Sequence, residues 1–345
     1  MKRSLNIFFG KTILKWFQLT NHPVVKVYTG YGDTKLLMVN GHVLKLSPLN
    51  RKRFVGNKFT NMFALIRLFL VRPYPNATVR LQWNEQTFDV QTEANGFFHF
   101  EWKPNQEPAT GWHPLFAKLV DPVNSEKILA TGEGSIFIPH VYQYACISDI
   151  DDTFLISHSS NFRKRLFVLL TESAISRKPF EGVVRHYQLL SKAGATGDEL
   201  NPFFYVSSSE WNLYDYIRDF SRHHELPPGI YLLNELKRLR QILQSGQGKH
   251  SAKFFRIARI IESYPLQKYI LLGDDSQEDP AIYASVVKHF PEKIYAVYLR
   301  RVKKSNESVV KEMINKIEST GVACCYFAHS EEAIEHSRLL GLIPE

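Results

Sequence analysis

The feature that most constrains this chain is an alternation of short apolar runs with longer amphipathic segments, from about residue 141 onward. Such alternation is typical of βα units, in which helices cover both faces of a parallel sheet. It predicts a three-layered α/β domain. The expected strands are 144–149, 203–207, 229–233, 269–273, 293–299 and 322–327. The expected helices lie around 160–172, 181–193, 210–222, 234–244, 251–263, 279–289, 305–319 and 330–339.

The preceding residues follow a different pattern, in which short stretches of alternating polar and apolar residues are separated by turn-forming residues. This pattern is typical of a β-sandwich. The expected strands are VVKVYTG, TKLLMVNG, GHVLKLS, ATVRLQW, QTFDVQT, GFFHFEW, AKLVD, KILATGEG and SIFIPH. Residues 57–70 have helical character instead, and we expect them to cross between the sheets or lie at an edge.

The length and the change of pattern indicate how the chain is divided. A chain of 345 residues is long enough for two buried cores. We therefore expect a basic N-terminal segment (1–22), a β-sandwich domain (23–140) and an α/β domain (141–345).

The formal charge of +9 is unevenly distributed along the chain. Residues 1–80 hold fourteen Lys and Arg against the single acid Asp33, so they carry +13 and the remaining residues −4. This asymmetry favours an anionic partner, either a phospholipid surface or nucleic acid. An ordinary solvated basic face is the plain alternative.

Two further features bear on location. Cys146, Cys324 and Cys325 show no paired spacing and no CxxC motif, which favours a reducing, cytoplasmic compartment. The opening stretch begins with basic residues, but Lys11 and Lys15 interrupt its apolar run and no small-residue cleavage site follows, so we expect no signal peptide. No apolar run reaches the length of about 18 residues that a transmembrane helix needs. If the protein meets lipid, we expect it to lie peripherally on the membrane.

Three predicted parallel strands end in polar residues: YACIS runs into DIDDT, FFYV into SSSEWNLY, and KYILLG into DDSQEDP. Ligands of such sheets bind outside the carboxyl ends of the strands. We therefore expect a single cleft to hold Asp149, Asp151, Ser207, Asp274, Asp275 and Asp279.

Several carboxylates in one cleft repel one another and need a compensating cation. An oxygen-only ligand set suits Mg²⁺, which can also bind a substrate phosphate. The sequence shows no convincing His or Cys cluster for zinc. The DIDD stretch also lacks the register of an EF-hand calcium loop, because no Gly falls at loop position 6 and Ser160 stands at position 12.

These motifs resemble a known family. DIDDT (149–153) matches the DxDxT signature of the haloacid dehalogenase (HAD) superfamily of phosphohydrolases, and Ser207, Lys253 and GDDSQEDP follow in that superfamily's order. YVSSSEWNLY, Lys253 twelve residues before Pro265, YILLGDDSQEDPAIYA and IYAVYLR resemble the actin-patch-protein type phosphatidate phosphatases over roughly residues 141–300. The resemblance implies that the α/β domain is a Rossmann-like HAD three-layer sandwich.

The resemblance also implies a role for each matching residue. Asp149 attacks phosphorus and becomes an aspartyl phosphate. Asp151 protonates the leaving alkoxide and then activates water. Thr153 fixes the loop that turns Asp151 inward, Ser207 holds phosphoryl oxygens, and Lys253 neutralises charge on the transferring group.

The expected Mg²⁺ ligands are Asp149, Asp151, Asp274 and Asp279. Asp275 and Asp279 can exchange roles as the second acidic group of the last motif. The plain structural alternative is that Ser207 and Asp279 cap helices. Arg300 and Arg301, at the end of the fifth strand, form either a positive lip toward an anionic substrate or ordinary surface.

Three functions stay open from the sequence. The first is a Mg²⁺-dependent phosphatase that hydrolyses phosphatidate to diacylglycerol and phosphate at a membrane surface, as the resemblance implies. The second is the same chemistry on a soluble phosphomonoester. The third is a non-catalytic adaptor for a membrane or the cytoskeleton. Nucleic acid is not the expected partner.

Overall fold

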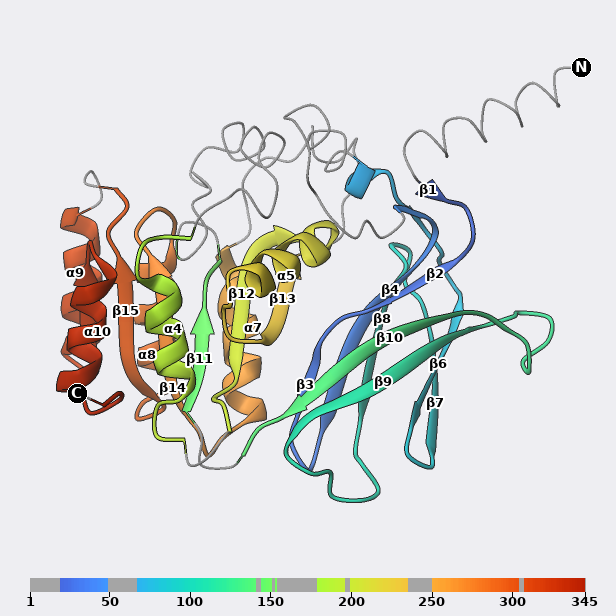
Figure 1. The fold of residues 1–345 in the computed structure, drawn as a ribbon, viewed down its shortest axis with the longest axis horizontal. Coiled ribbons are helices and arrows are strands. Elements are labelled where there is room, and N and C mark those ends of the chain that lie inside the picture. Colours follow the sequence, from blue (N-terminus) through green and yellow to red (C-terminus); the bar gives the residue numbers. More distant parts are fainter. Residues whose placement is uncertain are drawn as a thin grey trace, which may run out of the picture. The chain divides into compact units, whose positions relative to one another are not determined.

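The computed structural model describes residues 19–48, 67–140, 144–150, 153, 179–195, 199–234, 250–303 and 307–344. Within these ranges the chain divides into two compact units, one up to Ile138 and the other from Pro139 on (Figure 1). None of the helices in these ranges is both long enough and apolar enough to cross a bilayer. Several predicted segments lie outside the described residues: 1–18 of the basic segment, 57–66 of the helical segment, the helix at 160–172 and residues 235–244 of the next helix.

Strands of the N-terminal unit form one hydrogen-bonded sheet. They are β1 (Leu19–Thr20), β2 (Val24–Val27), β3 (Gly30–Gly32), β4 (Leu37–Pro48), β5 (Arg72–Pro73), β6 (Thr78–Trp83), β7 (Gln86–Gln91), β8 (Phe97–Trp102), β9 (Gly111–Val120) and β10 (Ile128–Ile138), with a short 3-10 helix, η1 (Arg67–Phe69). The order is β1-β4-β3-β10-β9-β6-β7, and β2, β5 and β8 also pair with β4. The β3–β10 pair is parallel and the other pairs are antiparallel.

The core of this unit explains why its strands form. In β6 and β8 every second side chain is buried, as the strand period of two requires. Those side chains join apolar residues of β2, β4, β9 and β10 in one core. The sheet therefore folds around a single apolar interior, and its two halves are continuous through the β3–β10 pair.

The sequence prediction was wrong about two turns in this unit. TKLLMVNG and GHVLKLS are one strand, β4, and KILATGEG and SIFIPH are one strand, β10. A Cβ on Gly41 would lie 2.1 Å from Phe98 Cζ and 2.3 Å from the Lys26 carbonyl oxygen. A Cβ on Gly132 would lie 2.4 Å from the Val25 carbonyl oxygen. These glycines allow other strands to approach closely and do not mark turns.

The C-terminal unit holds a parallel sheet of β11 (Tyr144–Ser148), β12 (Phe203–Glu210), β13 (Gly229–Asn234), β14 (Lys268–Asp274), β15 (Ile294–Arg300) and β16 (Ala323–Phe327). Its helices are α4 (Val183–Ser191), α5 (Tyr214–His223), α7 (His250–Ser263), α8 (Asp279–His289), α9 (Glu307–Glu318) and α10 (Ser330–Leu339), with a 3-10 turn, η2 (Trp211–Leu213). These bounds lie within a few residues of the predicted ones. The prediction of an α/β fold with a parallel sheet is confirmed.

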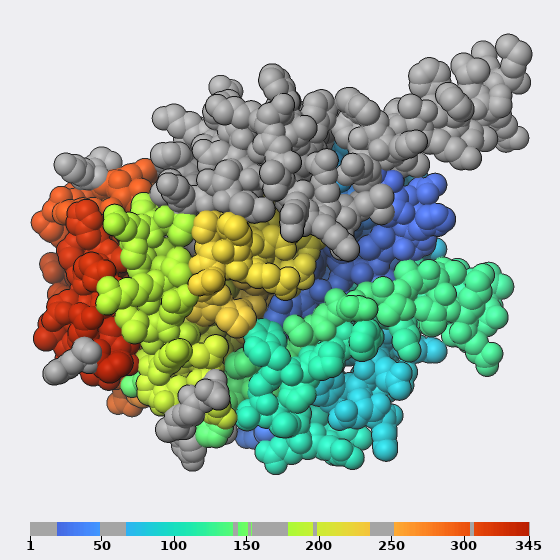
Figure 2. Space-filling model, in the orientation of Figure 1, coloured from blue at the N-terminus to red at the C-terminus, as the bar shows by residue number. Residues whose placement is uncertain are grey.

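The order of this sheet, β13-β12-β11-β14-β15-β16, places its switch point at β11. Figure 1 shows helices on both faces, which explains why β11, β13 and β14 are buried almost throughout. Helices α4 and α10 pack side by side (Figure 2), whereas α7, α8 and α9 pack against one another in chain order. In open α/β sheets a ligand crevice forms at the carboxyl ends of the strands beside the switch point.

Candidate active site

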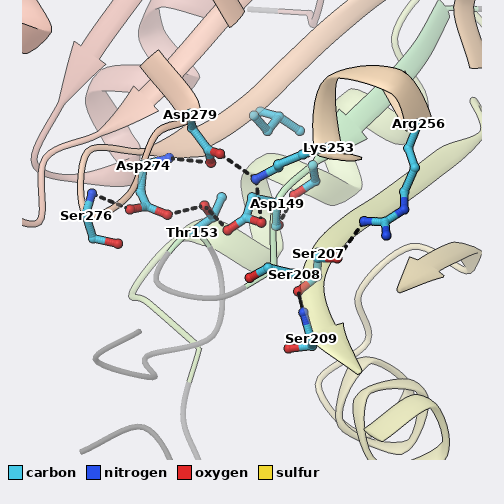
Figure 3. A network of polar contacts seen from close by, with 12 residues as sticks. Asp149, Thr153, Ser207, Ser208, Ser209, Lys253, Arg256, Asp274, Ser276 and Asp279 are labelled. Carbon is cyan, nitrogen blue, oxygen red and sulfur yellow. Dashed lines mark hydrogen bonds and ion pairs between the residues drawn. The ribbon is translucent and has the colours of Figure 1, made fainter. Parts of the chain in front are cut away.

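Three aspartates converge beside this switch point (Figure 3). Asp149 follows β11, Asp274 is the last residue of β14, and Asp279 is the first residue of α8. One carboxylate oxygen from each lies within 4.8 Å of the others, and all three side chains are buried. The backbone N–H of Asp149 donates to the Leu272 carbonyl at 2.8 Å, which fixes the end of β11 against β14. Among the described residues, this is the one acidic group that could hold a metal ion.

Lys253 supplies a positive charge to this cluster from the first turn of α7. Its Nζ donates to Asp149 Oδ1 at 2.7 Å and also to Asp279 Oδ1. Burial opposes the charge on the ammonium, but Asp149 and then Asp279 outweigh that effect and raise the pKa of Lys253. The ammonium therefore stays protonated and bridges two of the three carboxylates.

Thr153 contacts two members of the cluster, Asp274 and Asp149. Its Oγ1 lies 2.9 Å from Asp274 Oδ2 and 3.5 Å from Asp149 Oδ2. The second oxygen of Asp274, Oδ1, accepts the backbone N–H of Ser276 at 2.5 Å. The hydroxyl of Thr153 thus connects the segment after β11 to the end of β14.

Without a further cation the site is short of positive charge, because three buried carboxylates face one ammonium. Burial and, next, the charge of Asp279 raise the pKa of Asp274 to about 7, although hydrogen bonds from Ser276 and Thr153 oppose the shift. A carboxyl that resists ionisation indicates a place where a cation would be stabilising. The atoms that would bind a metal ion are all carboxylate oxygens, so the residues fit Mg²⁺.

Gly273 allows α8 to approach this strand end. A Cβ at this position would lie 2.7 Å from Asp279 Oδ2 and 2.7 Å from Tyr283 Cε2. The Tyr283 hydroxyl also donates to the Leu272 carbonyl at 2.8 Å, which ties the helix to β14. Asp279 therefore reaches the cluster because residue 273 has no side chain.

Ser207 lies in the neighbouring strand, β12, near the same edge of the sheet, since Ser148 of β11 pairs with Tyr205 of β12. Its Oγ is buried and accepts the backbone N–H of Ser209 at 2.9 Å. Arg256, one turn after Lys253 on α7, donates to the Ser207 carbonyl at 3.3 Å. The structure places Ser207 in a serine turn held by a guanidinium that the sequence prediction overlooked.

Asp275 points away from the cluster, which separates it from Asp279. Its Oδ1 accepts the backbone N–H groups of Val302 and Lys303 at 2.7 and 2.8 Å, and its Oδ2 accepts the Tyr326 hydroxyl at 2.7 Å. Asp275 thus holds the segment after β15. Of the two aspartates left open by the sequence, Asp279 lies with Asp149.

Asp151 lies outside the described residues, so its part in proton transfer and metal binding stays a prediction. Arg300 is neither a lip nor ordinary surface, because its side chain is buried and donates to the Thr153 carbonyl at 3.1 Å. Arg301, the next residue, is exposed. The signal for Arg300 was its place as the last residue of a strand whose other residues are apolar.

Residues 144–301 match the family model "Phosphatidate phosphatase APP1, catalytic domain". The chain is similar to an uncharacterized protein of Schizosaccharomyces pombe, 23% identical over 235 residues (67% of this chain, 37% of the relative). It is also similar to phosphatidate phosphatase APP1 of Saccharomyces cerevisiae, 27% identical over 186 residues (51% of this chain, 30% of the relative). The chain thus spans about a third of the length of these curated relatives.

Likeness to solved structures is lower. A carbohydrate acetylesterase from Xanthomonas citri matches over 87% of this chain and 66% of its own at 8% identity, with a TM-score of 0.31. The family match covers less than half of the chain but includes every described member of the acidic cluster. It confirms the resemblance found in the motifs. Over residues 144–301 the chain is similar to the catalytic domain of the APP1-type phosphatidate phosphatases.

Proposed function

We propose that residues 141–345 form a Rossmann-like HAD phosphatase domain that hydrolyses a phosphomonoester through an aspartyl phosphate, with Mg²⁺ as cofactor. The observation that carries this proposal is the buried group of Asp149, Asp274 and Asp279, which Lys253 bridges at the switch point of a parallel sheet. We propose further that residues 23–140 are a β-sandwich domain and residues 1–22 a basic segment.

Asp149 is the proposed nucleophile. Its carboxylate attacks phosphorus, the bond from phosphorus to the leaving alkoxide breaks, and phosphate stays on Asp149 as an acyl phosphate. Lys253 contacts Asp149 directly, so its ammonium can neutralise charge on the transferring group. Thr153 restrains the other Asp149 oxygen.

Asp151 is the proposed acid and base. It gives a proton to the leaving alkoxide in the first step and takes one from water in the second, when water cleaves the acyl phosphate and frees inorganic phosphate. Ser207 and the backbone N–H groups of its turn are the proposed contacts for phosphoryl oxygens.

The proposed metal ligands are Asp149, Asp151, Asp274 and Asp279. Three of these carry the oxygens that converge within 4.8 Å, and the raised pKa of Asp274 supports a cation there. Bound Mg²⁺ would supply positive charge to the phosphoryl oxygens and keep the nucleophile ionised.

Phosphatidate is the proposed substrate, because one relative is named a phosphatidate phosphatase and because the N-terminal part of the chain is basic. Each Lys or Arg near an anionic leaflet adds about 1 kcal/mol of attraction. Not every basic residue is available for this: Arg67 is buried, Arg80 pairs with Asp89, and Lys45 lies over the Tyr74 ring. The proposed location is cytoplasmic and peripheral on membranes.

The test compares phosphate release from phosphatidate in mixed micelles with release from soluble phosphomonoesters, each with Mg²⁺ and with EDTA. We expect Mg²⁺-dependent release with preference for phosphatidate. A preference for the soluble esters would contradict phosphatidate as the substrate but would still support phosphomonoester hydrolysis. No release from any ester would leave the adaptor as the better function.

A further inference from the structure

Arg300 makes a set of contacts that the proposed chemistry does not use. It ends β15 with only 3% of its surface exposed. Its Nε donates to the Thr153 carbonyl at 3.1 Å, Nη2 to Ser330 Oγ at 2.8 Å and Nη1 to the Ala328 carbonyl at 3.5 Å. The guanidinium also lies over the rings of Phe180 and Phe327, 4.6 and 4.8 Å from their centroids.

A guanidinium in this position is costly, because a buried charge loses its hydration. Burial lowers the pKa of Arg300 to about 10, although Tyr187, Asp274 and Glu332 oppose the shift, so the group is still charged at neutral pH. Its hydrogen-bond acceptors are two carbonyls and a hydroxyl rather than a carboxylate. Toward the described residues, the guanidinium therefore acts through directed hydrogen bonds, two of them to the backbone, and not through an ion pair.

Thr153 links this guanidinium to the acidic cluster. Its carbonyl accepts from Arg300, while its own Oγ1 lies 2.9 Å from Asp274 and 3.5 Å from Asp149. The geometry points to Arg300 as a positioning residue, which holds the backbone of Thr153 and thereby orients Asp149 and Asp274. This inference rests on the proposed role of Asp149 as nucleophile.

The far side of Arg300 is itself anchored. The Ser330 hydroxyl accepts from Arg300 and donates to the Glu181 carbonyl at 2.6 Å, which uses its single proton. Gly182 has a φ of +73°, and a Cβ there would lie 2.9 Å from Ser330 Cβ, so the turn before α4 sits tightly against the start of α10. Arg300 thus connects Thr153 to two helix starts that fix its position.

The test uses two variants of the full chain, Arg300→Lys and Arg300→Ala. Lysine keeps the positive charge but cannot donate to all three acceptors in the geometry of the guanidinium. We expect Arg300→Lys to lower kcat by about 100-fold with little change in KM, because a misplaced nucleophile slows chemistry rather than binding. Added guanidinium should restore part of the activity of Arg300→Ala, whereas methylammonium should not. Ser337→Ala is the matched control: its buried hydroxyl bonds His186 and Tyr298, not Thr153, and kcat should not change.

Amide hydrogen exchange by mass spectrometry gives a readout that needs no substrate. In Arg300→Lys the peptide containing Thr153 should exchange about tenfold faster than in the wild type, while peptides of β11 and β14 should not change. Unchanged exchange at Thr153, or a raised KM with unchanged kcat, would overturn the inference. If the wild type releases no phosphate from any ester, the proposed function fails and the exchange result alone decides the positioning role.

Discussion

The two units differ in where they bury polar groups. The N-terminal sheet closes around an apolar core, and its buried histidine, His42, is bonded to the Tyr28 hydroxyl. The parallel sheet buries charged side chains at the carboxyl ends of its strands, among them Asp149, Asp274 and Lys253. Burial of charge costs free energy in either place. Of the two units, the parallel one therefore gathers buried carboxylates and an ammonium at a single site.

The largest expected effect follows Asp149→Asn. The amide cannot attack phosphorus, so phosphate release should fall by at least about 1,000-fold while the fold is retained. The check is a phosphate-release assay on matched amounts of folded protein. Asp89→Asn, in the N-terminal sheet, is the control and should leave release unchanged. Equal loss in both variants would erase the proposed difference between the units.

Next in size is a pH dependence of stability. Burial raises the pKa of Asp274 to about 7 in the folded protein, against 3.8 for an ordinary carboxyl. The folded state therefore holds this proton more tightly than the unfolded state. The stabilisation that results is fully present below about pH 4 and is lost as the pH rises toward about 7. At 1.36 kcal/mol per pKa unit, the loss is about 4 kcal/mol.

Urea denaturation in EDTA at several pH values measures this loss as the difference between wild type and Asp274→Asn. The comparison cancels the pH dependence that other buried titratable groups add to both proteins. One such group is His186, whose pKa is lowered to about 3, mainly by burial. We expect the stability of the wild type relative to the variant to fall as the pH rises, and Mg²⁺ to remove much of that fall. Parallel curves in EDTA would contradict the electrostatic account of the cluster.

A smaller effect on stability is expected when alanine replaces a glycine, either at the acidic cluster or in the core of the N-terminal sheet. Gly273→Ala places a Cβ against Asp279 and Tyr283, and Gly41→Ala places one against Phe98. Each should lower the free energy of unfolding by about 1–3 kcal/mol through overpacking. Calorimetry measures the stability, and the same release assay measures turnover. Only Gly273→Ala should also reduce turnover; a similar reduction in Gly41→Ala would show that the units are not separable in function.

The smallest effect concerns the exposed pair of Arg80 and Asp89, which join β6 to β7 with an N–O distance of 2.8 Å. Exposed ion pairs contribute little because water and salt screen them. Thermal melts of Asp89→Asn should therefore shift less than those of either glycine variant, and the shift should shrink further in high salt. A shift as large as that of Gly41→Ala would indicate a structural role we have not recognised.

How much the sequence could predict differs between the units for a physical reason. In the parallel unit, apolar runs end in residues such as Asp149 and Asp274, so strand ends and site residues are marked by the same signal. In the N-terminal unit, Gly41 and Gly132 carry the signal of turns but serve close packing between strands. That use depends on which strands are neighbours, which a single sequence does not state.

The site shows the same limit. The meeting of Asp149, Asp274 and Asp279 could be predicted, because each lies at or shortly after the end of a strand in one parallel sheet. The separation of Asp275 from Asp279 could not, since it depends on Val302, Lys303 and Tyr326 as partners. The burial of Arg300 escaped for a similar reason: its acceptors are backbone carbonyls and a hydroxyl that only the fold brings together.

The most direct test of the central claim is to trap the intermediate. The protein is mixed with a phosphomonoester and Mg²⁺, quenched in acid, digested and examined by mass spectrometry for a phosphate adduct. The account predicts the adduct on Asp149 in the wild type and none in Asp149→Asn. Phosphate release with an adduct on another residue, or sustained turnover by Asp149→Asn, would contradict it.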